Sequence, residues 1–294
     1  MQNPSHNPTS DGRSREFVFV DADFDALRTL VKQATGISLG DSKRELVYGR
    51  VSRRLRALRL DSFAAYRELL ASGDPQEMVE FCNALTTNLT SFFREPHHFD
   101  YLREHVLLPR LADPRLPRRI RIWSSACSTG EEPYSIAMTV CESIPEWRQW
   151  DIKILATDID SQVLARARAG IYAEDRVRGL APRRIATHFQ HQGRHQGNAH
   201  DAQESAYKVT PDVASLVTFK PLNLMNEFPM TGPLDVIFCR NVVIYFDKET
   251  QRELFARMAR LQRAGDVLFL GHSENLFKVC DDYTLVGKTI YHRS

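Results

Sequence analysis

The chain has 294 residues, 43% of them hydrophobic, which is enough for one large domain and a smaller one and excludes disorder throughout. The formal net charge of +2 excludes a protein that binds polyanions over its whole surface. Five scattered cysteines without a C-x-x-C pair are typical of free thiols in a reducing compartment.

The first segment, 1–15, is polar and lacks the apolar core of a secretory signal, so we expect a disordered leader. No apolar stretch approaches the roughly 18 to 20 residues that cross a bilayer. We therefore expect a cytoplasmic protein without membrane insertion.

Between residues 16 and 95 apolar residues recur three and four positions apart, which predicts a helical N-terminal domain. Asp21 is placed to cap its first helix and Gly36 to end it, and Asp41 begins a second helix that runs to about Leu60.

A further helix is expected from near His97 to Leu111, before a proline-rich break, Asp113-Pro114-Arg115-Leu116-Pro117. We interpret 96–117 as a linker helix followed by a chain break.

Strand and helix patterns alternate in the rest of the chain, 118–294, which predicts an α/β domain with a mostly parallel sheet covered by helices. An antiparallel hairpin is expected at the C-terminal side of this sheet, as two short strands around Gly287. The predicted strands are 119–126, 152–158, 217–222, 234–239 and 266–270, and the predicted helices are 130–144, 161–169 and 247–263.

A segment at about 188–216 interrupts the alternation and is rich in Gln, His, Gly and Asn. It is either a flexible loop or a small inserted β subdomain. Insertions of this kind often carry partner recognition, because loops tolerate changes in length and face solvent.

A loop of small residues, Ser124 to Gly130, joins the first predicted strand to a helix that begins at Glu131. Small side chains let the backbone approach a ligand closely. The loop lacks G-x-G-x-x-G spacing, and a glutamate at the helix start would repel a pyrophosphate. An ammonium or sulfonium would be attracted, so S-adenosylmethionine fits better than NAD. The alternative is that Glu131 only complements the helix dipole.

Acidic and polar residues also follow two other predicted strands. Asp158 is placed to accept hydrogen bonds from ribose hydroxyls, whereas Asp160 is as well explained as the cap of the next helix. Arg240, Asn241 and Tyr245 follow the strand at 234–239, where α/β sheets bind ligands. Tyr245 alone would more readily be a core aromatic with a satisfied hydroxyl.

Six motifs, in this order, resemble the chemoreceptor glutamate methyltransferases, the CheR family. They are Thr87-Asn88-Leu89-Thr90-Ser91-Phe92-Phe93-Arg94, Ser128-Thr129-Gly130-Glu131-Glu132-Pro133-Tyr134-Ser135, Asp158-Ile159-Asp160, Asn223-Leu224, Cys239-Arg240-Asn241-Val242-Val243-Ile244-Tyr245-Phe246 and Gly271-His272-Ser273-Glu274-Asn275. The resemblance covers nearly the whole chain after Phe17.

The resemblance implies an S-adenosylmethionine-dependent enzyme with an all-α N-terminal domain, a class I methyltransferase domain of Rossmann-like fold and an inserted β subdomain. The products would be S-adenosylhomocysteine and a glutamyl methyl ester on a chemoreceptor's cytoplasmic helices, made in chemotactic adaptation. Arg94 and Tyr245 would lie near the transferred methyl. The cofactor contacts would be Asn88, Thr90, Arg94, Glu131, Asp158, Asn223, Leu224, Arg240 and Asn241.

Along 43–59 a helical projection places basic residues on one side and apolar residues on the other. A solvated face is one explanation, and a binding surface for the acidic receptor helices that the resemblance implies is the other. Nucleic acid is a competing partner, but aromatic residues between the arginines are missing. The predicted partner-binding residues are Arg50, Arg53, Arg54 and Arg56.

Four histidines, His188, His191, His195 and His200, lie in or beside the inserted segment without a nearby cysteine, and we predict no metal site there. In some family members the inserted subdomain binds a receptor's C-terminal peptide. Two other functions remain open: methylation of RNA or a small acid by the same cofactor domain, and a catalytically silent receptor-binding adaptor.

Overall fold

The computed structural model describes residues 15–194 and 205–294, and these form two compact units, Met1–Thr86 and Thr87–Ser294. Each unit is described by itself. The predicted leader, apart from Arg15, and the histidines His195 and His200 lie outside the described residues.

The first unit is helical, as predicted. It contains α1 (Asp21–Thr35), a 3-10 turn (Asp41–Lys43), α2 (Arg44–Leu58), α3 (Phe63–Ala71) and α4 (Pro75–Leu85). Gly36, at φ 77°, ends α1 in the left-handed conformation that favours glycine. The predicted capping role of Asp21 is wrong, because Val20 holds the cap position and the Asp23 carboxylate accepts from its N–H at 3.1 Å.

Apolar faces of these helices meet in a core that contains Leu27, Val47, Leu55, Phe63 and Phe81, each no more than 1% exposed. This core explains the spacing of apolar residues along the first unit.

The second unit begins with a loop and a helical segment: α5 (His97–Tyr101), a π-helical stretch (Leu102–Leu107) and α6 (Leu108–Ala112). The sequence predicted one regular helix here. Pro109 explains the π-helical stretch, because proline has no N–H and its ring crowds the preceding turn, so the backbone hydrogen bonds shift before it.

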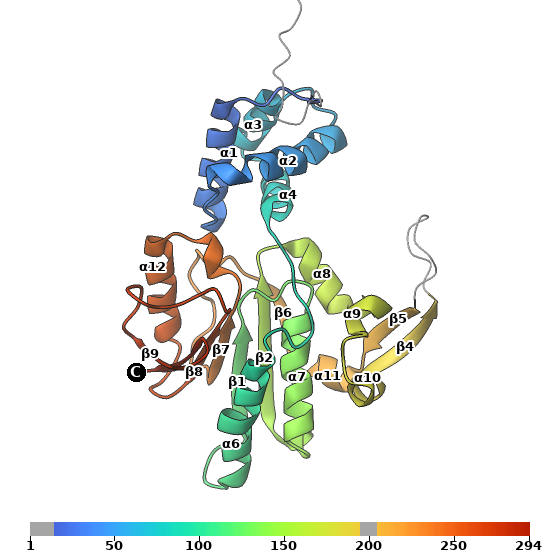
Figure 1. The fold of residues 1–294 in the computed structure, drawn as a ribbon, viewed down its shortest axis with the longest axis vertical. Helices are drawn as coiled ribbons and strands as arrows, with labels where there is room; N and C mark the ends of the chain where they lie inside the picture. Colours follow the sequence, from blue (N-terminus) through green and yellow to red (C-terminus); the bar gives the residue numbers. More distant parts are fainter. Residues whose placement is uncertain (1–14, 195–204) are drawn as a thin grey trace, which may run out of the picture. The chain divides into compact units, whose positions relative to one another are not determined.

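A seven-stranded sheet forms the centre of the second unit, in the order β6-β2-β1-β7-β8-β10-β9 (Figure 1). The pairs among the first five are parallel, and β10 is antiparallel to both β8 and β9. The strands are β1 (Arg119–Ser124), β2 (Asp151–Asp158), β6 (Val217–Pro221), β7 (Val236–Cys239), β8 (Val267–Leu270), β9 (Tyr283–Gly287) and β10 (Ile290–Arg293). The predicted mostly parallel sheet with an antiparallel hairpin is confirmed.

Three helices follow strands of this sheet: α7 (Glu131–Ser143), α8 (Ser161–Ala169) and α12 (Lys248–Ala259). Helix α7 is buried along nearly its whole length, as a helix packed on a sheet should be. Helix α12 ends before the predicted residue 263, because the chain turns at Leu261, whose carbonyl accepts from Leu234 at 2.7 Å.

A second, antiparallel sheet of order β3-β5-β4 lies apart from the large one (Figure 1). It begins at residue 171, earlier than the predicted insertion, because a three-residue strand leaves no readable pattern. The segment that contains this sheet comprises β3 (Ile171–Ala173), α9 (Glu174–Val177), α10 (Pro182–His188), β4 (Phe189–Arg194), β5 (Ser205–Val209) and α11 (Pro211–Ser215).

None of the described helices combines the length and apolar character that a membrane span requires.

Candidate functional site

The loop that follows β1 is held tightly against its neighbours. Ser125 N–H donates to the Phe238 carbonyl at 2.9 Å and Cys127 N–H donates to the Thr157 carbonyl at 2.9 Å, which ties the loop to β7 and β2. Gly130 has φ 98°, and a Cβ there would lie 2.8 Å from the Tyr172 hydroxyl. Only glycine fits this position.

Glu131, the first residue of α7, is almost completely buried, with 1% of its side chain exposed. Its carboxylate accepts from the Thr129 hydroxyl at 2.6 Å and forms an ion pair with Arg176 of α9. The sequence did not point to Arg176, because α9 is only four residues long. The negative charge predicted for this position is therefore present, but it already faces a guanidinium.

Asp158 lies at the end of β2 and is 7% exposed. It accepts from Ser128 N–H at 2.8 Å and Asp160 N–H at 3.0 Å. Burial raises the pKa of Asp158 to about 6, and no Lys or Arg in the described ranges forms an ion pair with it.

Asp160, by contrast, caps α8 by accepting from Gln162 N–H at 2.9 Å and Val163 N–H at 3.2 Å. It also accepts from the Asn88 side chain at 2.7 Å. The capping interpretation of Asp160 is confirmed.

Asp158 and Glu131 suit S-adenosylmethionine, the cofactor that the sequence implies. A buried carboxylate without a cation is costly, and hydroxyl donors such as those of a ribose would satisfy its remaining lone pairs. Glu131, at the start of α7, offers a second carboxylate, which stabilises positively charged groups such as the Arg176 guanidinium that already faces it. The chemistry of this donor set fits S-adenosylmethionine.

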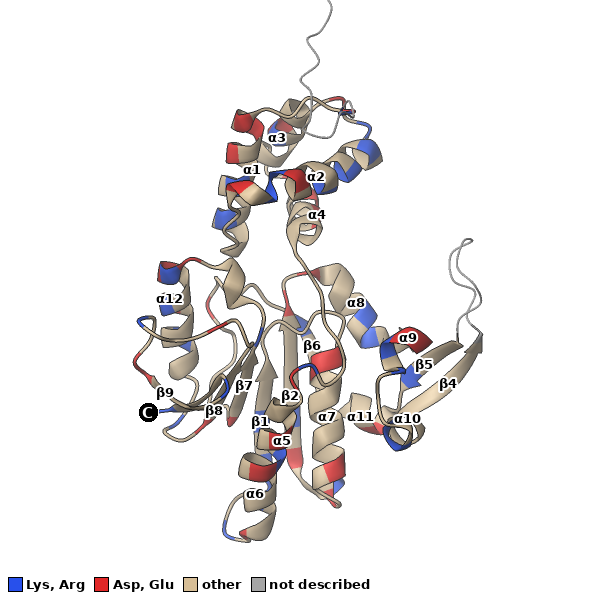
Figure 2. Cartoon of the chain, in the orientation of Figure 1, with Lys and Arg blue, Asp and Glu red and all other residues tan. Residues whose placement is uncertain are grey.

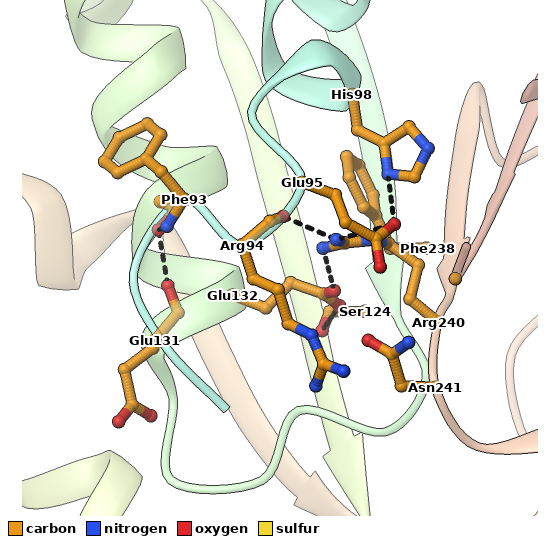
Figure 3. Close-up of polar contacts among 12 residues, drawn as sticks. Phe93, Arg94, Glu95, His98, Ser124, Glu131, Glu132, Phe238, Arg240 and Asn241 are labelled. Carbon is orange, nitrogen blue, oxygen red and sulfur yellow. Dashed lines mark hydrogen bonds and ion pairs between the residues drawn. The ribbon is translucent and has the colours of Figure 1, made fainter. Parts of the chain in front are cut away.

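Arg240, directly after β7, is buried in a charge network rather than facing open space. Its guanidinium pairs with Glu132 at 2.8 Å and Glu95 at 3.3 Å and donates to the Arg94 carbonyl (Figure 3). Ser124 donates to Glu132 at 2.7 Å. Although burial opposes ionisation, the hydrogen bond from His272 and the Arg240 charge lower the pKa of Glu95 to about 2. This network fixes the backbone that carries Arg94.

Asn241 adopts φ 57°, a left-handed conformation that is uncommon outside glycine. Glu274 holds it there: its buried carboxylate accepts from the N–H groups of Asn241 at 2.8 Å, Val243 at 2.9 Å and Gly271 at 2.6 Å. Glu274 lies in the last of the six motifs, but the sequence alone assigned it no role. A carboxylate that ends the motif Gly-x-x-Glu was the available signal.

The segment before α5 supplies three of the predicted site residues. The Asn88 carbonyl accepts from the Ser128 hydroxyl at 3.0 Å, and the Thr90 carbonyl accepts from Arg176 at 2.9 Å. Arg94 donates to the Leu89 carbonyl at 2.9 Å, and its side chain extends away from Glu95 (Figure 3). The segment therefore lies against the loop after β1.

Two further predicted contacts lie beyond β6. Leu222 N–H donates to the Asp158 carbonyl at 3.0 Å, which brings Asn223 and Leu224 beside the end of β2. The Asn223 side chain accepts from Met225 N–H at 3.0 Å. Tyr245 ends a 3-10 turn (Val243–Tyr245) and is partly exposed.

Among the described residues, one group brings together side chains that can bind a metal ion: Glu95, His97 and His98 each offer a ligand atom within 4.8 Å of the others. The charge of Glu95 is already compensated by Arg240 at 3.3 Å. Burial, together with the Arg240 charge, lowers the pKa of His98 to about 3. A cation would meet an arginine here, so the arrangement favours a structural network.

The four predicted partner-binding arginines lie on α2, among the basic residues of the first unit (Figure 2). Arg50 donates to the carbonyls of Ala84 and Thr86, and Arg54 pairs with the buried Glu77. Arg56 forms a half-exposed pair with Glu16 at 2.9 Å, and Arg53 is exposed.

Comparison with known proteins gives the family. The model described as "CheR methyltransferase, SAM binding domain" matches residues 88–292, and that described as "CheR methyltransferase, all-alpha domain" matches residues 22–86. The chain belongs to the CheR methyltransferase family. The SAM-binding model, for S-adenosylmethionine, spans the unit that contains the buried acids, and the all-α model spans the helical unit.

Curated relatives of the CheR family cover most of this chain. The chemotaxis protein methyltransferase of Klebsiella aerogenes is 46% identical over 275 residues, which is 92% of this chain and 89% of the relative. The Escherichia coli K12 protein of the same name is 42% identical over 92% of this chain and 90% of its own. Chemotaxis protein methyltransferase 2 of Pseudomonas aeruginosa is 44% identical over 98% and 99%.

Proposed function

We propose that this chain methylates glutamate side chains on the cytoplasmic helices of chemoreceptors, with S-adenosylmethionine as the methyl donor, and thereby takes part in chemotactic adaptation. The family supports the reaction class. The observation that carries the rest is a partly exposed arginine, Arg94, on a segment fixed against the acidic strand ends by Arg240 and Ser128.

The proposed site needs no general base. A glutamate side chain has a pKa of about 4.3 and is ionised at neutral pH, so it is already a nucleophile. The cofactor, when bound, supplies a methyl group on a positively charged sulfur. The task left to the protein is alignment, and well-held reactants can lower a barrier by roughly 7 to 11 kcal/mol.

Arg94 is suited to hold the incoming carboxylate. A guanidinium presents a planar fork that matches a carboxylate, and Arg240 fixes the Arg94 backbone by donating to its carbonyl. Tyr245 lies on the loop that Glu274 anchors and carries a hydroxyl that could donate to the substrate. We assign the remaining predicted residues, Asn88, Thr90, Asn223, Leu224 and Asn241, to the cofactor.

The test is transfer of tritiated methyl groups to a purified receptor cytoplasmic fragment. A glutamyl methyl ester releases its label as methanol in base, whereas a methylated nitrogen keeps it. We expect base-labile label, and we expect Arg94→Ala to reduce turnover at saturating substrate by at least about a hundredfold. Stable label would indicate another substrate, no label with retained receptor binding would indicate an adaptor, and unchanged turnover in Arg94→Ala would remove Arg94 from the mechanism.

For receptor docking, we restrict the proposed binding residues on α2 to two of the four predicted arginines. Arg50 and Arg54 are held by part-buried or buried acceptors, whereas Arg53 is exposed and the Arg56 pair with Glu16 is half-exposed, so we assign the acidic receptor helix to Arg53 and Arg56. Charge reversal at both should weaken receptor methylation at low salt more than at high salt, since exposed charges are screened. Equal weakening at both salt concentrations would argue against this surface.

The inserted sheet offers a second docking site. Strand β4 pairs only with β5 in the described sheet and so leaves one edge available for an added strand, which is a common way to bind an extended peptide. We propose that a receptor's C-terminal peptide binds there. Titration of the protein with that peptide, followed by the amide signals of β4, tests this; shifts confined to other elements would place the peptide elsewhere.

A further inference from the structure

Arg176 belongs to the inserted segment, yet it contacts Glu131, the carboxylate that the sequence predicts to bind the cofactor. It forms an ion pair with Glu131 and donates to the Thr90 carbonyl at 2.9 Å. Its side chain is 37% exposed, whereas Glu131 is 1% exposed. The guanidinium therefore stands between a buried carboxylate and solvent.

The position of Arg176 is fixed by its neighbours. Tyr172 on β3 donates its hydroxyl to the Thr129 carbonyl at 2.8 Å and packs edge-on against Phe92, with ring centroids 4.8 Å apart. Helix α9 follows β3 directly, so the strand that carries Tyr172 also carries Arg176 to the loop after β1. The inserted segment thus forms one wall beside that loop.

The hydrogen bonds of Arg176 to the Thr90 carbonyl and to Glu131 both use one terminal nitrogen, Nη2. Nε and Nη1 have no hydrogen-bond partner within the described residues. The Nε and Nη1 donors point to different sides of the guanidinium, so each can give a ligand carboxylate one charge-assisted hydrogen bond.

The charges of the pair suit one part of S-adenosylmethionine. Glu131 alone would attract any cation, but Glu131 beside Arg176 is a neutral pair that attracts an isolated cation less. The amino-acid end of the cofactor carries an ammonium and a carboxylate on the same carbon. A carboxylate and a guanidinium placed side by side complement that zwitterion.

We propose that Arg176 binds the carboxylate of the cofactor's amino-acid end while Glu131 binds its ammonium. The proposal rests on the proposed function, since it assumes that S-adenosylmethionine occupies this site. It makes a residue of the inserted segment part of the cofactor site and gives that segment a role in selecting the complete cofactor.

Three ligands separate this role from a purely structural one: S-adenosylhomocysteine, its decarboxylated analogue, and 5′-methylthioadenosine, which lacks both charged groups. Calorimetric titration of each into the wild type, Arg176→Ala and Arg176→Lys measures the affinity. Arg178, exposed on the same segment, supplies a control of equal charge change as Arg178→Ala.

We expect Arg176→Ala to weaken S-adenosylhomocysteine binding about tenfold or more, as for the loss of a charge-assisted hydrogen-bonded pair. The decarboxylated analogue should bind Arg176→Ala as tightly as it binds the wild type, or more tightly, because its ammonium would meet an uncompensated Glu131. Methylthioadenosine should be unaffected, which also shows that the variant is folded. Arg176→Lys should fall between, and Arg178→Ala should match the wild type.

Equal weakening of all three ligands by Arg176→Ala would overturn the proposal and make Arg176 a structural residue. Unchanged or tighter binding of S-adenosylhomocysteine would also overturn it and make Arg176 a competitor of the ammonium. If the wild type bound none of the three ligands, the proposed function would fail as well. The two failures are therefore distinguishable.

Discussion

Cofactor binding should depend on the protonation of Asp158. Burial raises the pKa of this carboxyl to about 6, so it is about nine-tenths ionised at pH 7 and about one-tenth ionised at pH 5. A protonated carboxyl has fewer lone pairs for ribose hydroxyls and carries no charge. If only the carboxylate binds well, the affinity for S-adenosylhomocysteine falls about tenfold between pH 7 and pH 5.

The same shift acts on folding with the opposite sign. The folded pKa lies above the ordinary value of 3.8, so Asp158 contributes stability below about pH 4 that is lost as the pH rises through about 6. The difference of about two pKa units corresponds to about 3 kcal/mol in the free energy of unfolding. The ligand-free protein therefore carries a cost at neutral pH that ligand hydrogen bonds can offset.

Two measurements on the wild type and Asp158→Asn test this reasoning. Calorimetry at pH 5, 6 and 7 gives the affinity for S-adenosylhomocysteine, and urea denaturation at the same pH values gives the free energy of unfolding. The variant should bind more weakly at pH 7 and lose most of both pH dependences. Other groups that titrate in this range are common to both proteins, so the difference isolates Asp158. Identical pH slopes in the two proteins would refute the assignment.

Three other variants are informative. Tyr245→Phe should keep S-adenosylhomocysteine affinity within about twofold while slowing methyl transfer, and a calorimetric loss of affinity would move Tyr245 to the cofactor contacts. Glu274→Gln places an amide donor among the N–H groups that the carboxylate accepts, so the free energy of unfolding should fall by at least about 2 kcal/mol; an unshifted urea midpoint would contradict the anchoring role. Glu77→Gln leaves Arg54 without its buried carboxylate partner and weakens the Tyr66 hydrogen bond of 2.6 Å. The free energy of unfolding, measured by thermal denaturation, should fall by about 2 to 3 kcal/mol. Wild-type stability in this variant would show that the pair contributes little.

Much of the fold could be predicted from the sequence because its strands are long enough to show a pattern. The strands β1 and β2 and the helix α8 lie within one or two residues of their predicted bounds, and a proline or a capping acid marks several helix starts. The small sheet could not be delimited, because β3 has three residues and its partner β5 is separated from it by α9, α10 and β4.

The residues of the candidate site could also be predicted only in part from the sequence. Glu131 and Asp158 could be found because carboxyl ends of parallel strands meet at one edge of a sheet. Arg176 and Tyr172 could not, since their contacts with the loop after β1 span 45 and 43 positions of sequence. Nor could spacing reveal that Arg50 and Arg54 are engaged within their unit, because the carbonyl acceptors of Arg50 and the Glu77 partner of Arg54 lie on α4 or directly after it.

The anchoring of the Asn241 loop by Glu274 has a consequence for synthesis. Every residue assigned to the cofactor leaves the ribosome before Glu274, and the strand β10, which fills the place between β8 and β9, follows later still. A nascent chain thus contains Glu131 and Asp158 before it contains Glu274, which shapes the neighbouring Asn241 loop. Competence to bind the methyl donor should arise abruptly, once Glu274 and β10 have been synthesised, rather than accumulate as the polypeptide grows.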